Sequence, residues 1–181
     1  IIRQAVDIGR LICMLDPAEV AERDRRMKAA MKDPALGLKP PPEPRLGYAC
    51  AYRAADTEAG YLSVQGPVRH AGREGLFDDV IGKGWQLLLR STNGPAVIEP
   101  STASIIQQMG IVVADFGPQG DTQDPEEIYS AWFDRIGAEA VLVRPDFYIF
   151  GTSSLANIGA LTGSAWAMMN KADVTSSSAK S

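Results

Sequence analysis

The sequence has few of the residues on which most catalytic thiol and metal sites depend. Its 181 residues include two cysteines and one histidine. Cys13 and Cys50 do not form a CxxC pair, and His70 has no second histidine in the chain, so neither a disulfide framework nor a zinc site is indicated. Cys13 has the apolar neighbours Leu11, Ile12 and Met14, which predict a buried, unreactive thiol.

Long apolar runs and an excess of basic charge are also missing. No run approaches the roughly 18–20 apolar residues that span a bilayer, and the N-terminus shows no signal-peptide pattern. Lys and Arg number 18 against 22 Asp and Glu, and basic residues cluster only between residues 23 and 32. We therefore expect a cytoplasmic protein that binds neither nucleic acid nor membranes.

The composition that remains is that of a globular protein. Hydrophobic residues make up 45% and charged residues 22%, and the length suits one domain or one domain with an appendage. The chain opens directly on an amphipathic helix, predicted over 1–14, with no cap before it. We therefore expect a fragment of a longer protein.

The first 33 residues are predicted to be a helical segment. Asp16-Pro17-Ala18-Glu19 is a strong helix start, and that helix should run to about Lys32. Its mixed charges favour a solvated face with i,i+4 ion pairs over a phosphate-binding face. Residues 34–60 follow as a proline-rich connector and loops, with five prolines between residues 34 and 44. A stiff connector is favoured there, and a ligand for an SH3-type groove is the alternative.

Residues 61–170 are predicted to form an α/β domain. Loops and one or two edge strands are expected over 45–75, including the apolar stretch 61–64. From Trp85 the pattern becomes β-α-β-α-β-β-α, followed by a polar tail at 171–181. The expected strands are 85–90, 111–116, 140–144 and 147–150, and the expected helices begin at Pro100, at Asp124 and at Ser153 or Ser154. Gly110 and Gly137 should end the first two helices.

This order of elements is the thioredoxin-like topology, but the redox chemistry of thioredoxins is absent from it. That chemistry needs a thiolate of low pKa at the start of the first core helix. Here the helix start is Glu99-Pro100-Ser101-Thr102, with no cysteine. Residues 137–139, just before the third core strand, contain no proline. The sequence predicts the fold without its CxxC active site.

The remaining candidate groups are assigned structural roles. Carboxylates that could hold a hard cation are interpreted as strand-end and cap residues, and they are Asp78, Asp79, Asp115, Asp121 and Asp124. His70 is expected to face solvent from a glycine-rich loop. No serine lies in a G-x-S-x-G elbow, and neither Gly82–Gly84 nor Gly117–Gly120 fits a phosphate-binding fingerprint. We assign no catalytic, cofactor-binding or metal-binding residue.

Three stretches together resemble a known family. They are Gly9-Arg10-Leu11-Ile12-Cys13-Met14-Leu15-Asp16-Pro17 with Arg23-Asp24-Arg25-Arg26-Met27, then Leu76-Phe77-Asp78-Asp79-Val80-Ile81-Gly82-Lys83-Gly84-Trp85, then Val141-Leu142-Val143-Arg144-Pro145-Asp146. The chain resembles the C-terminal third of FAD-dependent aromatic hydroxylases, most closely the 3-(hydroxyphenyl)propionate hydroxylases. The resemblance runs from Ile2 to about Gly151.

The resemblance implies the chemistry of an intact parent enzyme. Such a flavoprotein monooxygenase uses NAD(P)H to reduce FAD and hydroxylates a phenolic ring ortho to its hydroxyl, in aromatic catabolism. The family's FAD motifs have no counterpart in this chain, so the fragment is expected to bind no cofactor and to be inactive alone. Residues 1–33 would end the catalytic region, and the C-terminal domain would be structural or interfacial.

Two hypotheses follow from the sequence. One is a noncatalytic structural or assembly domain of an aromatic hydroxylase, with the upstream catalytic domain of the same chain as its partner and a homo-oligomer, most simply a dimer, as its assembly. The other is an autonomous thioredoxin-like binding or redox adaptor. An adaptor is expected to open with its own Met and helix cap, whereas this sequence opens inside a predicted helix, which favours the first hypothesis.

Overall fold

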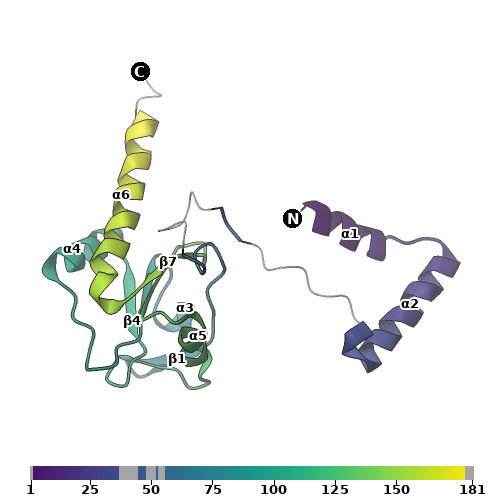
Figure 1. Ribbon diagram of the computed structural model, residues 1–181, viewed down its shortest axis with the longest axis horizontal. Helices are drawn as coiled ribbons and strands as arrows, with labels where there is room; N and C mark the ends of the chain where they lie inside the picture. The colour runs from purple at the N-terminus through teal and green to yellow at the C-terminus, as the bar shows by residue number, and fades with distance from the viewer. Residues whose placement is uncertain (1, 37–44, 48–51, 53–55, 178–181) are drawn as a thin grey trace. The chain divides into compact units, whose positions relative to one another are not determined.

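The computed structural model describes residues 2–36, 45–47, 52 and 56–177 (Figure 1). The chain divides into two compact units, Ile1–Pro44 and Arg45–Ser181. The boundary lies inside the predicted connector. Within the described ranges, none of the helices is long and apolar enough to cross a membrane.

The N-terminal unit is a pair of helices. Helix α1 spans Ile2–Ile12 and α2 spans Pro17–Lys32, followed by one short 3₁₀ turn, η1, at Pro34–Leu36. The Asp16 carboxylate accepts hydrogen bonds from the backbone N–H groups of Ala18 (2.9 Å) and Glu19 (3.0 Å), which confirms the predicted cap. The Arg23 guanidinium donates to the Leu11 carbonyl at 3.1 Å and so joins α2 to the end of α1.

One expectation about this unit is confirmed in part, and another is wrong. Helix α2 is solvated as predicted, with no buried residue, but the ion pairs among its described side chains join Glu22 to Arg25 and Arg23 to Asp24, spacings of three residues and one rather than the predicted four. Cys13 is exposed rather than buried, because α1 ends at Ile12 and the thiol lies in the connection between the helices. Cys50 lies outside the described residues.

The C-terminal unit contains two sheets. The larger has the strand order β4-β3-β6-β7. Strand β3 (Gln86–Leu89) pairs in parallel with β4 (Val112–Asp115) and antiparallel with β6 (Ala140–Val143), which pairs antiparallel with β7 (Ile149–Ser153). The smaller sheet has the order β2-β1-β5, from β1 (Pro67–His70), β2 (Arg73–Leu76) and β5 (Thr122–Gln123), all antiparallel.

Helices cover both faces of the larger sheet. Helix α4 (Pro100–Met109) and the start of α6 (Ile158–Ser177) pack on the face that carries Leu87, Leu89 and Leu142. Helix α5 (Ile128–Ile136) and the short α3 (Phe77–Val80) pack on the opposite face. Figure 1 shows the sheet between these two layers. The predicted helix ends are confirmed, since Gly110 and Gly137 adopt left-handed φ values of 62° and 63°.

Helix α5 begins later than predicted. We expected a start at Asp124, but the helix starts at Ile128, and Glu127 before it has a left-handed φ of 55°. The Asp124 carboxylate caps the helix from the preceding turn, accepting the N–H groups of Ile128 (3.1 Å) and Ser130 (2.8 Å). The prediction that Asp124 caps this helix is therefore confirmed, whereas the predicted first residue of the helix is wrong.

At the other end, α6 continues to Ser177, although a polar tail was expected from residue 171. A 3₁₀ turn at Leu155–Asn157, η3, leads into this helix after Ser154. One or two edge strands were expected over 45–75, and β1 and β2 form a hairpin at 67–76, almost wholly inside that range.

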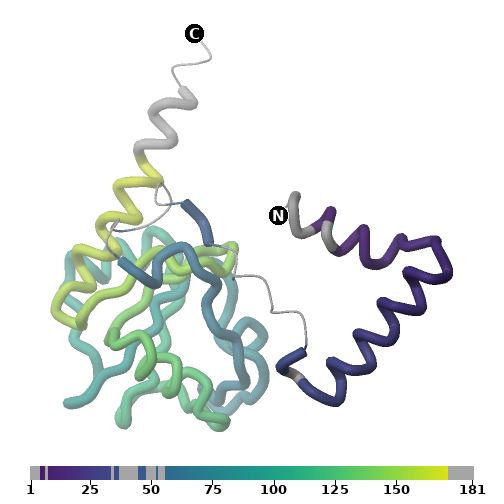
Figure 2. The backbone as a smooth tube through the Cα atoms, turned by 45° about the vertical axis from the view of Figure 1, so that its right-hand side comes forward, coloured from purple at the N-terminus to yellow at the C-terminus, as the bar shows by residue number. Residues whose placement is uncertain are grey.

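The segment before β1 is part of the C-terminal unit and covers the outer edge of β7. The Gly60 N–H donates to the Ile149 carbonyl and the Ile149 N–H donates to the Tyr61 carbonyl, both at 2.8 Å. The Asp56 carboxylate accepts the Thr152 N–H at 2.7 Å. Within the apolar stretch 61–64, the structure forms one isolated bridge, between Leu62 and Tyr148, rather than a regular strand. This segment is the blue trace of Figure 2.

Candidate functional site

The start of α4 is the position where a thioredoxin carries its redox thiol, and it has no cysteine here. Glu99 precedes the helix and makes no side-chain capping bond, and Pro100 takes the first helical position. Thr102 is buried beneath α6, where a methyl group added at Gly159 would lie 2.9 Å from the Thr102 Oγ1. Glu99, Pro100 and Ser101 are exposed, so the helix start is open to solvent but carries no thiol.

Asp115 organises the loops that follow β3 and β4. Its Oδ1 accepts the N–H groups of Ser91 (3.1 Å) and Gly117 (2.9 Å), and its Oδ2 accepts the Ala96 N–H at 3.2 Å. The Asp115 N–H in turn donates to the Asp121 carboxylate at 3.0 Å. These bonds tie the loop after β3 to the loop after β4, so the expectation of strand-end carboxylates holds here.

The pKa of Asp115 lies below its ordinary value. Burial on its own would raise this pKa. The hydrogen bonds assigned to the Ser91 hydroxyl and to the backbone N–H groups of Ser91, Gly117 and Ala96 stabilise the ionised carboxylate. Together they lower the pKa by more than burial raises it. The buried Ser91 hydroxyl has no partner of hydrogen-bonding geometry, so we assign the lowering mainly to the three backbone donors. A carboxylate that fixed donors hold in its ionised form stabilises the two loops and is poorly suited to transfer a proton.

His70 lies on β1 and has a hydrogen-bond partner, which corrects the expectation of a solvent-facing loop histidine. Its side chain is 25% exposed and its Nδ1 lies 3.0 Å from the Thr122 Oγ1, across the β1–β5 pairing. The Thr122 hydroxyl donates to the Asp121 carboxylate at 2.9 Å. Since its single proton is used there, the His70 Nδ1 must donate to Thr122.

The hydrogen bonds of His70 and Thr122 do not have the directions that a nucleophile and its general base require. A general base accepts the proton of the nucleophile, whereas His70 donates towards Thr122. Thr122 is also 4% exposed, so a substrate has no access to its hydroxyl. A shallow depression of about 400 Å³ lies beside His70, with Arg69, Glu74 and Gln123 at its rim. The cluster fixes β5 against β1.

In the other acidic pair, Asp78 bonds to protein groups through its carboxylate and Asp79 through its backbone carbonyl. The Asp78 carboxylate accepts the side-chain amides of Gln65 (3.2 Å) and Gln86 (3.3 Å). The Asp79 carbonyl accepts the Arg73 guanidinium. Across the part of the chain that the structure describes, no group of three or more His, Cys, Asp or Glu residues could hold a metal ion.

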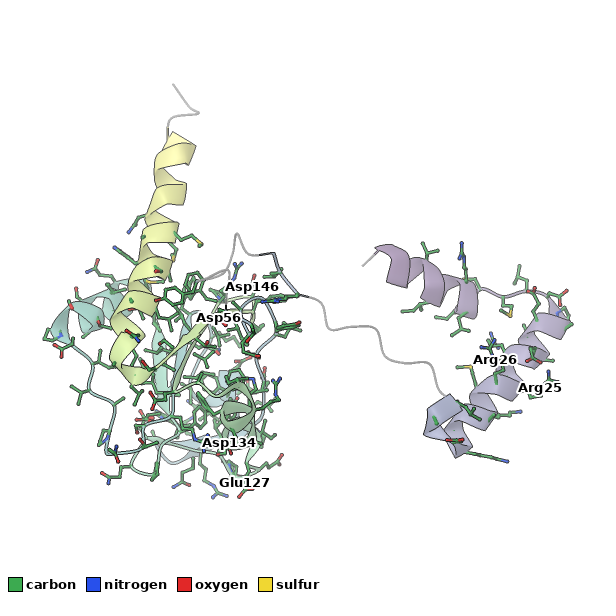
Figure 3. All side chains as sticks on the ribbon, viewed as in Figure 1. Arg25, Arg26, Asp56, Glu127, Asp134 and Asp146 are labelled. Atoms are coloured by element: carbon green, nitrogen blue, oxygen red, sulfur yellow. The ribbon has the colours of Figure 1, made fainter. Side chains whose placement is uncertain are left out.

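The N-terminal unit carries an apolar groove. A groove of about 460 Å³ runs between the helices, lined by Leu11, Met14, Met27 and Ala30 with Arg23 and Arg26 at its side. Figure 3 shows Arg25 and Arg26 on α2. Large apolar side chains stay exposed over the whole unit, and they are Val6, Ile8, Ile12, Leu15, Met27, Met31 and Leu36.

The two helices of the N-terminal unit have little buried surface of their own. Helix α2 has no buried residue, and Leu15 and Met31 are 92% and 86% exposed. A pair of short helices without a core depends on contacts from outside for its stability. An apolar surface of this kind is typical of a face that another part of a protein covers.

Comparisons with known proteins give one family and one curated relative. The family described as the HcaD C-terminal domain matches residues 60–167. A probable NADH-specific resorcinol 4-hydroxylase from Rhodococcus jostii (strain RHA1) is 30% identical over 159 residues. That match covers 83% of this chain and 28% of the relative, so the chain spans about a quarter of the relative's length.

Two solved structures are similar at the level of overall shape only. An aklavinone-11 hydroxylase, in a ternary complex with FAD and aklavinone, is 22% identical with a TM-score of 0.44, covering 66% of this chain and 25% of that one. The flavin-dependent monooxygenase PieE, with FAD and substrate, is 18% identical with a TM-score of 0.45, covering 90% and 31%.

Proposed function

Because the chain belongs to the HcaD C-terminal domain family, we propose that it is the noncatalytic C-terminal part of a flavin-dependent aromatic hydroxylase. The observation that carries this proposal is the family match over residues 60–167, together with polar clusters around Asp115, His70 and Asp78 that are hydrogen-bonded to other protein groups. The named resorcinol 4-hydroxylase supports it, since its own chain is several times longer than this one. The chemistry is thus assigned to residues outside this chain.

The finer assignment concerns the reaction of the whole enzyme. We propose that it uses NAD(P)H and FAD to hydroxylate a phenolic substrate ortho to its hydroxyl group. A hydroxyphenylpropionate is the substrate favoured by the sequence resemblance, and resorcinol is the one in the relative's name. Both carry the phenolic hydroxyl that this chemistry requires, so the two substrates are to be tested side by side.

The described residues do not fit FAD. The turns at Gly82–Gly84 and Gly117–Gly120 come closest to the glycine-rich cradle that a diphosphate needs. Gly82 and Gly84 precede β3 instead of opening a helix. A methyl group at Gly117 or Gly120 would overlap the carbonyl of Ser91 or Asp115, so those backbones are already packed on protein. No step of the reaction is assigned to residues of this chain.

The role proposed for this part is structural. Residues 1–33 would close the catalytic region and be covered by it, and residues 61–170 would form a thioredoxin-like domain. The strand order β4-β3-β6-β7, with one parallel and two antiparallel pairings, supports that topology. The autonomous redox adaptor is disfavoured, because the start of α4 carries no thiol.

The test compares this chain with the whole enzyme. We expect the 181-residue chain to leave FAD fluorescence unchanged and to oxidise no NADH or NADPH. The whole enzyme should copurify with FAD and release a catechol-type product from 3-(3-hydroxyphenyl)propionate or from resorcinol. Stoichiometric FAD binding by the short chain, or a whole enzyme without flavin, would overturn the proposal.

A further inference from the structure

The loop that joins β3 to α4 contains the dipeptide Asn93-Gly94, and it leads into the start of α4 in Figure 1. The chain has three asparagines, and Asn93 is the one that glycine follows. Asn93 is exposed, and Gly94 has a φ of 103°, which glycine adopts without strain. Asparagine is chemically labile in proteins, and a glycine after it leaves the next amide nitrogen uncrowded.

The two groups that react in such a dipeptide are not engaged elsewhere. Across the described residues, neither the Asn93 side-chain amide nor the Gly94 N–H has a hydrogen-bond partner. Apart from its chain neighbours, a methyl group added at Gly94 would meet no atom closer than the Gln119 Oε1, at 4.0 Å. The Gly94 nitrogen can therefore approach the Asn93 Cγ without breaking a bond of the fold or displacing a packed side chain.

The other two asparagines lie in helical backbone. Asn157 belongs to η3 and its Nδ2 donates to the Ser154 Oγ at 3.0 Å. The N–H of the next residue, Ile158, donates to the Leu155 carbonyl. Asn170 lies within α6. Helical hydrogen bonding and a β-branched neighbour both hinder attack on these side chains, so they serve as comparisons within the same chain.

The segment around Asn93 is held at both of its ends by one carboxylate. The Ser91 N–H donates to the Asp115 Oδ1 at 3.1 Å, and the Ala96 N–H donates to the Asp115 Oδ2 at 3.2 Å. Asn93 and Gly94 lie between these two residues in sequence. A change of chain length or of charge at this dipeptide therefore acts on both hydrogen bonds.

We propose that Asn93 is a site of spontaneous deamidation, and that its conversion releases the loop after β3 from Asp115. The Gly94 nitrogen attacks the Asn93 Cγ and forms a new C–N bond. The bond from Cγ to the side-chain nitrogen breaks, and ammonia leaves with the Gly94 proton. Water then opens the resulting succinimide at either carbonyl, which gives aspartate or isoaspartate. The reaction consumes water, releases ammonia and needs no oxidant or reductant.

Both products weaken the two hydrogen bonds to Asp115. Each product adds a carboxylate to the segment that binds the Asp115 carboxylate, and like charges at short range repel. Isoaspartate also places its Cβ in the main chain, which lengthens the path from Ser91 to Ala96 by one atom. This inference goes beyond the proposed function, since it concerns a covalent change within the C-terminal unit itself.

The direct test incubates the 181-residue chain at neutral and at mildly alkaline pH and maps its peptides by mass spectrometry. Electron-transfer fragmentation distinguishes aspartate from isoaspartate. Asn93 should convert many times faster than Asn157 and Asn170. Its rate should rise with pH, because the deprotonated Gly94 nitrogen is the attacking group. Equal rates at the three asparagines, or no product at Asn93, would refute the site.

A second measurement follows the hydrogen bonds to Asp115. In chains that carry isoaspartate at position 93, amide hydrogen exchange at Ser91 and Ala96 should be several-fold faster than in fresh chains. The amides of Ile128 and Ser130, which donate to a different carboxylate, are the control and should be unchanged. Unaltered exchange at Ser91 and Ala96 would show that the loop stays attached, which contradicts the proposed release.

Two variants separate the chemical step from its consequence. Asn93→Gln keeps a neutral amide, but its ring closure would give a less favoured six-membered imide, so incubation should leave exchange at Ala96 at its initial rate. Freshly purified Asn93→Asp carries the new charge without the inserted atom and should already exchange faster than the parent. Faster exchange in incubated Asn93→Gln, or parental exchange in Asn93→Asp, would contradict this account. Hydroxylation by the whole enzyme, assayed separately, reports on the proposed function alone.

Discussion

Asp115 joins two loops through a charge that the fold keeps ionised. Three backbone N–H groups converge on its carboxylate, and hydrogen bonds to charged acceptors are among the stronger ones in proteins. Replacing the carboxylate by an amide removes the charge and turns an NH₂ group towards backbone donors. The loops after β3 and β4 should then separate more easily.

We predict that Asp115→Asn lowers the free energy of unfolding by about 2–3 kcal/mol at pH 7. Urea unfolding of the variant and its parent measures this directly. Asp134→Asn is the control, since Asp134 is exposed on α5 and pairs with Arg90 at the surface. A loss no larger than that of the control would show that the backbone donors find water instead.

The pH dependence follows from the direction of the pKa shift. The folded-state pKa of Asp115 lies below the ordinary value of 3.8, so its ionisation stabilises the folded chain above that value. That contribution is lost as the pH falls through the folded-state pKa. The stability of the parent should therefore drop more steeply below pH 4 than that of Asp115→Asn, and parallel curves would contradict the assignment.

At the scale of single elements, the described residues between 45 and 63 are bonded to one another and to β7. The Asp56 carboxylate accepts both the N–H and the hydroxyl of Thr152, at 2.7 and 3.0 Å. The Arg45 guanidinium donates to the carbonyls of Asp56 and Ala59, each at 2.9 Å, and lies over the Tyr61 ring. These contacts hold the segment on β7.

We expect Asp56→Ala to release this segment while the rest of the unit stays folded. Amide hydrogen exchange at Gly60 and Ile149 should speed up at least several-fold, because their backbone bonds lose the anchor beside them. Glu74→Ala breaks a surface ion pair with Arg69 and should leave those amides unchanged. Equal protection in all three proteins would show that Asp56 is dispensable.

Local signals predict much of this fold. The cap at Asp16 and the left-handed glycines at 110 and 137 act within a few residues, so sequence alone places those helix ends. The strands β3 and β6 are buried throughout and form short apolar runs that stand out between polar turns. Interactions confined to one element are thus visible in the sequence.

Contacts between distant residues are not visible in the same way. Asp56 and Thr152 are separated by 96 positions, and nothing in either neighbourhood predicts their bond. His70 meets Thr122 across 52 positions, which is why it was expected in solvent. The position of Asp124 predicted a cap correctly, but its carboxylate spans an intervening turn, so the helix starts at Ile128.

For the whole molecule, the two units differ sharply in how they are stabilised. The buried hydrophobic residues lie between Ala59 and Ala165, all in the C-terminal unit, whereas the described residues before Pro44 contribute none. The described N-terminal helices thus contain no buried hydrophobic residue and present an apolar face. That face is what the sequence predicted for the surface of α1.

We predict that the 181-residue chain self-associates at high micromolar concentration and that a chain beginning at Arg45 stays monomeric. Light scattering measures both, and the melting temperature of the two should agree within a few degrees. A monomeric parent chain would contradict the prediction, as would a truncated chain that still forms dimers. The second result would move the association surface to the C-terminal unit.

The covered edge of β7 also limits where the C-terminal unit can be truncated without exposing an unpaired strand. A strand edge without a neighbour presents unpaired N–H and C=O groups to any chain that meets it and favours intermolecular sheet formation. A chain shortened to begin at Val64 would lose the residues that bond to the backbone of Phe147, Ile149 and Phe150. Such a chain should aggregate on refolding, whereas one that begins at Arg45 retains its own edge protection.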